Sequence, residues 1–416
     1  MGLRMIIILS IIILAEYYSF TLINSLVRNL PGVWRISLIT IYVALTILIW
    51  GGILFFRKIF WHGMPSFFRN VYIALVLGVF IGKILIMAVL MIDDVRRLFT
   101  WLVSLFVTGS DTVSGKTAFN MSRSVFFKRT AIFLGGLSVT GFLYGMSNRY
   151  NYKVKKVKVK LSNLPEAFNG FKIVQISDIH TGSFDDYDAV AKGISLAMDQ
   201  KPDLLVFTGD LVNSRADEVD EKYQEIFSKL KAPMGVFSTL GNHDYGDYVH
   251  WPNPQAKKDN LEKLKSIQAS MGWKLLMNEH VILEKGNDKI GLIGIENWSA
   301  KSNFSRYGDM RKAYDGLAEK NVPVKILLSH DPSQWDAQVR TEYKDVDLTL
   351  SGHTHGMQMG VDTKWLKWSP VQYMYKEWAG IYQGDNQYLY VNRGFGFLGY
   401  AGRLGIMPEI TVIELV

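Results

Sequence analysis

The sequence predicts a chain of two parts, a membrane region of several helices followed by an α/β domain. Long apolar runs fill the first part, strands alternate with helices in the second, and the charge balance changes near residue 150. Residues 1–150 hold 14 Lys and Arg against 4 Asp and Glu, and the remainder holds 32 against 34. The net charge of +8 therefore comes from the first part and predicts no nucleic-acid surface on the second. We expect domains at 1–150 and 151–416.

Apolar runs in the first part predict about four transmembrane helices. A bilayer takes about 20 helical residues to cross. Three runs reach that length, at residues 5–23, 36–56 and 71–92. The run 131–146 becomes a fourth span if residues 125–127 join it, with Lys128 and Arg129 snorkelling. The run 98–108 is too short to span and is expected at the interface.

Two charged residues, Glu16 and Lys83, fall inside the predicted spans. A charge inside a membrane marks a functional site by default, and transport is one such function. The structural alternative, which we favour, is an interhelical pair or a snorkelling side chain.

The Lys and Arg residues of the short loops predict how the chain is oriented in the membrane, because cytoplasmic loops carry more of them. With four spans, loops 24–35 and 93–130 share one side and carry 8 basic residues, whereas the N-terminus and loop 57–70 carry 4. This count places both termini outside the cytoplasm. Six basic residues in 147–160 argue the other way, but residues 154–160 alternate as a half-buried strand does, and large domains cross a membrane regardless of charge. We therefore expect an extracytoplasmic second domain.

Periodicity in the second part predicts an α/β layered domain with ligands at the carboxyl ends of its strands. Helices are expected at 185–199, 218–231, 256–270, 307–320 and 333–339. Strands are expected at 171–177, 204–208, 235–240, 281–284, 290–295, 324–328, 346–350, 388–391 and 409–414.

Five of these strands end in Asp, His or Asn. The segments are Ser177-Asp178-Ile179-His180, Thr208-Gly209-Asp210, Gly241-Asn242-His243-Asp244, Ser329-His330-Asp331 and Gly352-His353-Thr354-His355. In extended backbone His353 and His355 point to one side, and imidazole is the commonest metal ligand. The chain has no cysteine, so the ligands are oxygen and nitrogen. Such a set suits Mn²⁺, Fe or Zn²⁺ and argues against Ca²⁺.

These segments, in this order, resemble the calcineurin-like metallophosphoesterase family over residues 153–416. The resemblance implies two packed sheets flanked by helices and a dimetal phosphoric ester hydrolase. It implies a first metal held by Asp178, His180, Asp210 and His355. It implies a second held by Asp210, Asn242, His330 and His353, with Asp210 bridging. His243 takes the place of the family's catalytic histidine, and Asp244 that of its orienting partner.

The spans, together with residues 390–394 and 408–410, resemble a transmembrane bacterial branch of this family, some of whose members cleave UDP-diacylglucosamine in lipid A synthesis. Met357 stands where that branch often has glycine, which puts the shape of the pocket in doubt. Arg393 is a candidate for binding a substrate phosphate, and a structural arginine is the alternative. Aromatic residues between 365 and 382 either form a rim that meets lipid or pack over the domain.

We therefore predict a multi-pass membrane phosphoesterase that uses two divalent ions (Mn, Fe or Zn). Its substrate would be a phosphomonoester, phosphodiester or pyrophosphate of lipid or envelope origin. One alternative is a cytoplasm-facing UDP-2,3-diacylglucosamine-type pyrophosphatase. Another is a transporter or receptor with a regulatory phosphoesterase-like domain. No nucleic-acid partner is predicted, and the sequence leaves the oligomeric state open.

Overall fold

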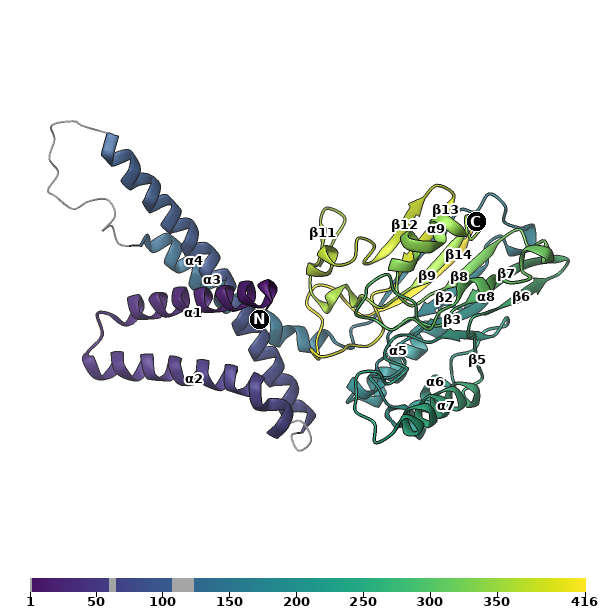
Figure 1. Cartoon of the computed structure of the whole chain (residues 1–416), viewed down its shortest axis with the longest axis horizontal. Coiled ribbons are helices and arrows are strands. Elements are labelled where there is room, and N and C mark those ends of the chain that lie inside the picture. Colours follow the sequence, from purple (N-terminus) through teal and green to yellow (C-terminus); the bar gives the residue numbers. More distant parts are fainter. Residues whose placement is uncertain (1, 60–64, 107–122) are drawn as a thin grey trace. The chain divides into compact units, whose positions relative to one another are not determined.

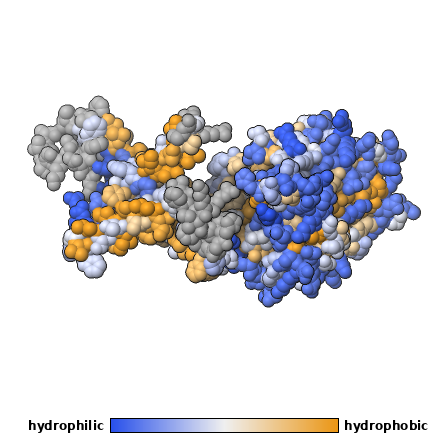
Figure 2. Space-filling view, turned by 60° about the horizontal axis from the view of Figure 1, so that its bottom comes forward, coloured by the Kyte–Doolittle hydropathy of each residue, from blue (hydrophilic) through white to orange (hydrophobic). Residues whose placement is uncertain are grey.

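The computed structural model describes residues 2–59, 65–106 and 123–416. The chain forms two compact units, Met1–Tyr144 and Gly145–Val416 (Figure 1). Apolar side chains cover much of the visible surface of the helices in the first unit, whereas the second unit is mostly hydrophilic on the face shown in Figure 2.

Four helices make up the described part of the first unit. They are α1 (Leu3–Val27), α2 (Gly32–Ile59), α3 (Ser66–Phe106) and α4 (Val125–Gly145). All four are long and apolar enough to cross a membrane, as the sequence predicted.

The helix α3 is longer than the sequence suggested. The interface segment expected at 98–108 continues α3 as far as residue 106, and residues 107 and 108 lie outside the described residues. No glycine or proline interrupts residues 83–106. Ion pairs at i and i+3 join Asp93 to Arg96 and Asp94 to Arg97, at 2.8 and 2.9 Å. These pairs support a helix across the charged stretch at which the predicted span ended.

Helices α3 and α4 approach each other closely at small residues. A Cβ added to Gly82 would lie 3.0 Å from the carbonyl oxygen of Gly135, and one on Gly78 would lie 2.8 Å from the Cα of Val139. Ser138 donates a hydrogen bond to the carbonyl of Gly78 at 2.9 Å. Because apolar side chains gain little from leaving lipid, such close backbone contact is the usual basis of helix association in membranes.

The two charges inside the spans form an interhelical pair. The Lys83 ammonium of α3 lies 2.6 and 2.8 Å from the two carboxylate oxygens of Glu16 in α1. From α2, Trp50 and Tyr42 donate to the same carboxylate at 2.8 and 3.1 Å. Glu16 is thus joined to two other helices, which agrees with the structural interpretation.

Two six-stranded mixed sheets form the second unit. The order of the first is β1-β14-β2-β3-β4-β5 and that of the second is β12-β13-β9-β8-β7-β6. The first contains β1 (Lys153–Val159), β2 (Lys172–Ile176), β3 (Leu204–Thr208), β4 (Val236–Thr239), β5 (Trp273–Leu275) and β14 (Glu409–Leu415). The second contains β6 (Glu279–Lys285), β7 (Asp288–Gly294), β8 (Lys325–Leu328), β9 (Leu348–Ser351), β12 (Gly380–Gly384) and β13 (Gln387–Val391).

Alternate residues of the strands face opposite layers. In β3, Leu204 and Val206 join the core between the sheets, whereas Leu205 and Phe207 face the helices of the first sheet. The flanking helices are α5 (Tyr187–Met198), α6 (Glu221–Phe227), α7 (Pro254–Ser270), α8 (Met310–Tyr314) and α9 (Arg340–Glu342). Figure 1 shows α5, α6 and α7 together on one side of the strands. The predicted fold class, two packed sheets flanked by helices, is confirmed.

Some elements differ from prediction. The helix expected at 307–320 is reduced to α8, because Gly316 takes a left-handed conformation (φ +72°) that ends it. Strands β5 and β12 and a separate hairpin, β10 (Val361–Asp362) with β11 (Lys367–Trp368), were not predicted. Strands β5, β10 and β11 have only two or three residues and carry too little periodicity to be seen in a sequence. Strand β12 has five residues but begins and ends with glycine, which strands disfavour.

Candidate metal centre

The five polar strand ends meet at one edge of the second unit. Strands β2, β3 and β4 are parallel neighbours in the first sheet, and β8 and β9 are parallel neighbours in the second. Each strand is followed within about one to four residues by a predicted site residue. Because the carboxyl ends of parallel strands lie at the same edge, packing the two sheets brings all five loops together.

The backbone at these loops is held in an uncommon conformation. Five of the predicted ligands have a left-handed φ between 50° and 72°, namely Asp178, His180, Asp210, His353 and His355. This conformation costs a non-glycine residue about 1–3 kcal/mol and collects at functional sites. Gly352 is required beside them, because a Cβ there would overlap the Asp178 carboxylate.

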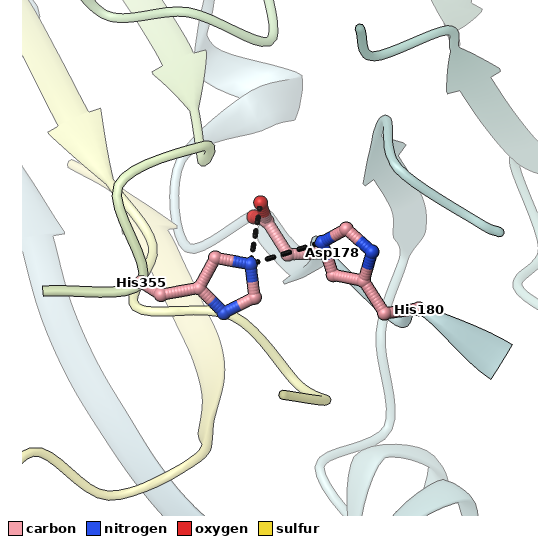
Figure 3. Close-up of side chains that lie close together, drawn as sticks. All are labelled: Asp178, His180 and His355. Atoms are coloured by element: carbon pink, nitrogen blue, oxygen red, sulfur yellow. Dashed lines mark hydrogen bonds and ion pairs between the residues drawn. The ribbon is translucent and has the colours of Figure 1, made fainter. Parts of the chain in front are cut away.

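The first group of candidate ligands consists of Asp178, His180 and His355, whose side chains point toward one another in Figure 3. Nε2 of His355 lies 3.3 Å from a carboxylate oxygen of Asp178 and 3.0 Å from Nε2 of His180. One ligand atom from each residue lies within 4.8 Å of the others. All three residues are buried, and their ligand atoms share one small space.

The second group consists of Asp210, His330 and His353, and its ligand atoms also lie within 4.8 Å of one another. Nε2 of His330 lies 3.1 Å from Oδ2 of Asp210 and 3.3 Å from Nδ1 of His353. The backbone N–H of His353 donates to both oxygens of Asp178, which ties the second group to the first.

Asp210, a member of the second group, also approaches the first group. Its Oδ2 is 3.6 Å from Nε2 of His180 and 3.1 Å from Nε2 of His330. One oxygen is therefore close to a histidine of each group, as a bridging carboxylate would be.

Hydrogen bonds around the site leave acceptor atoms directed inward, as a metal requires. Asn242 donates through Nδ2 to Tyr248 at 2.9 Å, and its Oδ1 is buried without a hydrogen-bond partner among the described residues. Nδ1 of His330 lies 2.7 Å from the carbonyl oxygen of Thr208. Since a carbonyl only accepts, Nδ1 carries the proton and Nε2 is the nitrogen available to an ion. Such outer hydrogen bonds fix the tautomer of metal-binding histidines.

His353 is oriented in the same way. The Tyr375 hydroxyl donates to Asp331 at 3.2 Å and lies 2.8 Å from Nε2 of His353. With its one proton directed at Asp331, the hydroxyl accepts from Nε2, so Nδ1 of His353 faces the other ligands. The residues present therefore fit two divalent ions held by nitrogen and oxygen.

Burial and charge set the protonation of the group. Burial lowers the pKa of His180 well below its usual value and also lowers that of His353, which keeps both rings neutral. Burial would lower the pKa of His330 as well, but the Asp210 carboxylate outweighs it and raises that pKa to about 10. Without an ion, His330 therefore holds a proton at the nitrogen that faces Asp210.

The prediction that Asp244 orients His243 is wrong. The Asp244 carboxylate instead accepts hydrogen bonds from the backbone N–H groups of residues 210, 211, 212 and 241, at 2.8–3.2 Å. Burial, followed by the charge of Asp210, raises its pKa to about 7. Nδ1 of His243 lies 2.7 Å from the carbonyl oxygen of Asn213. A backbone carbonyl thus holds the ring, while Asp244 stabilises the loop that carries Asp210.

Arg393 is paired with two carboxylates. Its guanidinium forms ion pairs with Glu409 and, at 3.1 Å, with Asp362, and its side chain is only 7% exposed. It does not line the cavity over the metal groups. The structure favours a structural role for Arg393, because its positive charge is already paired with two carboxylates and is not available to a substrate phosphate.

An open cavity of about 210 Å³ lies over the two groups. Its walls include His243, Asn242, Phe304 and Leu398, and also Met357, Val371, Met374 and Tyr375. A substrate entering it would therefore meet a polar floor and largely apolar walls.

Two family descriptions match the chain. "Calcineurin-like phosphoesterase" matches residues 171–357, and "Probable Calcineurin-like phosphoesterase, transmembrane domain" matches residues 3–149. The chain is 32% identical over 260 residues to the uncharacterized metallophosphoesterase YkuE of Bacillus subtilis, covering 62% of this chain and 83% of that protein. The chain belongs to the calcineurin-like metallophosphoesterases.

Two further relatives of this metallophosphoesterase have named activities. The phosphodiesterase YaeI of Escherichia coli is 26% identical over 71% of this chain and 100% of its own length. The UDP-2,3-diacylglucosamine pyrophosphatase LpxG of Chlamydia trachomatis is 28% identical over 56% of this chain and 81% of its own length. The family is dimetal-dependent, and the four apolar helices make this member a membrane protein.

Sequence reasoning missed three supports of this metallophosphoesterase site. Asn213 acts through its carbonyl, which every residue type has, so no sequence signal exists. Tyr375 was seen only as one of many aromatic residues. The fully buried Arg403 donates to the carbonyls of residues 355, 393 and 394 and so supports the His355 loop. Its position in a loop with several separate glycines gives no indication of this.

Proposed function

We propose that this protein hydrolyses a phosphoester with two divalent ions bound at the candidate metal centre. Asp178, His180, Asp210 and His355 would hold one ion, and Asp210, Asn242, His330 and His353 the other. The observation that carries the proposal is the position of Asp210, whose Oδ2 is close to a histidine of each group. When bound, such a pair of ions activates water and stabilises both oxygens of an in-line displacement.

The protein side chains would hold the ions and contribute to proton transfer. Buried carboxylates and neutral imidazoles would hold the ions, and the loops keep these ligands in a strained backbone conformation. His243 lines the cavity with Nδ1 bonded to Asn213, which leaves Nε2 to act on a substrate. In the imidazolium form of His243, Nε2–H would protonate the leaving oxygen or stabilise charge on the phosphoryl group.

The donor set supports Mn, Fe or Zn as the metal, because nitrogen and oxygen ligands dominate. Purified full-length protein should be stripped with a chelator, reloaded with each ion and assayed on nitrophenyl phosphate and on nitrophenyl phosphodiesters. Turnover restored by an ion, together with two ions per chain, supports the proposal. A protein that binds ions but turns over no ester would instead favour a transporter or receptor with a regulatory domain.

We propose a lipid or envelope phosphoester as the substrate class, with the second unit outside the cytoplasmic membrane. Support comes from the membrane helices and from the largely apolar walls of the cavity. The likeness to LpxG supports a second candidate, a UDP-2,3-diacylglucosamine-type pyrophosphatase. That substrate is a nucleotide sugar of the cytosol, so the two candidates differ in topology.

Single cysteines can decide the topology, because the chain has none of its own. Lys344 is exposed in the second unit, and Asn29 is exposed in the loop predicted to lie on the opposite side of the membrane. In intact cells, a membrane-impermeant maleimide should label Lys344→Cys and spare Asn29→Cys, and lysis should expose both. The reverse pattern would place the site in the cytoplasm and favour the pyrophosphatase. The loop count behind this prediction includes residues 60–64 and 107–122, which lie outside the described residues.

A further inference from the structure

Exposed apolar side chains are concentrated in one short segment of the second unit. Ten large apolar or aromatic side chains are exposed in residues 145–416, and eight of them lie between residues 357 and 381. We call residues 357–381 the aromatic segment. Trp365 is 95% exposed and Tyr373 78%, far more than such side chains show on an ordinary protein surface.

The aromatic segment is an ordered part of the second unit and has a small hydrophobic core of its own. Four of its residues, Val371, Tyr375, Trp378 and Ala379, form a buried cluster with Ile406. The β10–β11 hairpin pairs Val361 with Trp368 and lies outside both sheets, where β11 is labelled in Figure 1. The segment therefore holds its exposed side chains on an ordered base.

The aromatic segment also forms part of the cavity over the metal groups. Met357 and Met374 both line that cavity and are 43% and 53% exposed. Apolar surface thus runs from the cavity wall to the outside of the segment. This surface suits a molecule whose phosphate lies at the metal groups and whose alkyl tail extends over Met357 and Met374.

The partner best matched to this surface is a lipid bilayer. The last residue of the apolar helix α4, Gly145, is also the first residue of the second unit. Its carbonyl accepts from Arg403, and the next residue, Leu404, bonds to Gly360 of the aromatic segment at 2.9 Å. Two backbone hydrogen bonds, through Arg403 and Leu404, therefore connect the aromatic segment to Gly145, near the end of the last predicted span. Trp and Tyr are the residues enriched at the interface between membrane and water, and exposed Lys364 beside Trp365 suits anionic headgroups.

We propose that the aromatic segment docks on the bilayer, and that the substrate is the phosphoester of an amphiphile lying in it. This substrate assignment rests on the proposed phosphoesterase function, whereas the docking does not. Trp365 and Tyr373 enter the interface, and the amphiphile reaches the metal groups past Met357 and Met374.

Docking can be measured without any activity. A nitroxide on a single introduced cysteine reports whether its surroundings are lipid or water. Full-length Trp365→Cys and Tyr373→Cys should be labelled and reconstituted in vesicles of phosphatidylcholine and phosphatidylglycerol. Lys344→Cys is the matched control, because Lys344 is exposed and precedes β9 at the end opposite the metal groups.

Power saturation with oxygen and with a water-soluble nickel chelate gives the depth of each label. We expect the labels at 365 and 373 to be more accessible to oxygen than to the nickel chelate, and the label at 344 to be accessible to the nickel chelate. Water exposure at 365 and 373 equal to that at 344 would overturn the docking. Protection from both reagents would also overturn it, since that result indicates a protein contact.

The substrate class can be tested with two esters that share a leaving group, hexadecyl p-nitrophenyl phosphate and methyl p-nitrophenyl phosphate. In vesicles we expect the protein to prefer the hexadecyl ester in kcat/KM by about tenfold or more, because its tail partitions into the bilayer beside the segment. Trp365→Ala combined with Tyr373→Ala should reduce this ratio toward that of free solution. An equal rate on both esters with the unaltered protein would overturn the substrate class. If neither these esters nor nitrophenyl phosphate is turned over with any ion, the phosphoesterase function is overturned instead. The spin-label result then tests the docking by itself.

Discussion

The two units each bury a polar cluster, and the clusters differ in how completely their atoms are paired. In the first unit, three donors from two helices converge on the carboxylate of Glu16. In the second unit, pairing is incomplete. Nδ1 of His180 and Oδ1 of Asn242 are buried without a hydrogen-bond partner among the described residues.

This difference separates a structural cluster from a ligand site. A buried polar group costs free energy unless it is paired, so a cluster with matched donors and acceptors is stable by itself. A cluster with unpaired polar atoms gains stability when cations bind those atoms. The presence of buried charge therefore does not identify a site, but the balance of donors and acceptors does.

Removing the shared carboxylate should have the largest effect. Asp210→Asn keeps the shape of the side chain but loses the charge between the two groups, so we expect activity to fall by about 10⁴-fold, since metal stabilisation of charge is worth several kcal/mol. Metal content by mass spectrometry and turnover of a nitrophenyl ester check this. Two ions per chain with full activity would contradict it.

Altering His243 should have the next largest effect and spare the metals. His243→Asn should keep both ions and lose about 10²–10⁴-fold in rate, the range of positioned acid catalysis. The loss should be greater for esters with poor leaving groups than for nitrophenyl esters. If His243 only supports the loop of Asn242, the second ion will be lost as well, or the loss will be equal for both kinds of ester.

Breaking the pair in the first unit should affect stability and leave chemistry intact. Glu16→Gln leaves the Lys83 ammonium buried without its counter-charge, which costs about 3–5 kcal/mol in comparable pairs. The double variant Glu16→Gln with Lys83→Met removes both charges and should be more stable than the single one. Thermal unfolding in detergent measures this. A loss of turnover per folded molecule would show that the pair does more than join helices.

The smallest expected effect is a pH dependence of metal binding. The pKa of His330 is raised to about 10 because Asp210 outweighs the effect of burial, so the metal-free ring is protonated at neutral pH and an ion must displace that proton. Metal affinity should therefore rise about tenfold per pH unit for each proton displaced, until the pH approaches this pKa. Calorimetry in buffers of different ionisation enthalpy counts the protons released, and no release would contradict the assignment.

The sequence by itself determined the membrane helices, the fold class and the residues of the candidate site. Apolar length and strand periodicity are local properties, and the chemistry of Asp, His and Asn at strand ends is visible in five short segments. The sequence does not predict the length of α3, because the charges at residues 93–97 end the apolar run although nothing there breaks a helix.

Only the tertiary structure decided which atoms meet. The sequence could not tell that the loops after β2 and β9 face each other across two sheets, because strand order depends on packing between distant residues. For the same reason Asp244 could not be separated from His243, its neighbour in the chain. Nearly every residue has a peptide N–H and a carbonyl, so the sequence does not show which of them, such as the carbonyl of Asn213, will bond to a side chain. These hydrogen bonds are defined only in the folded chain.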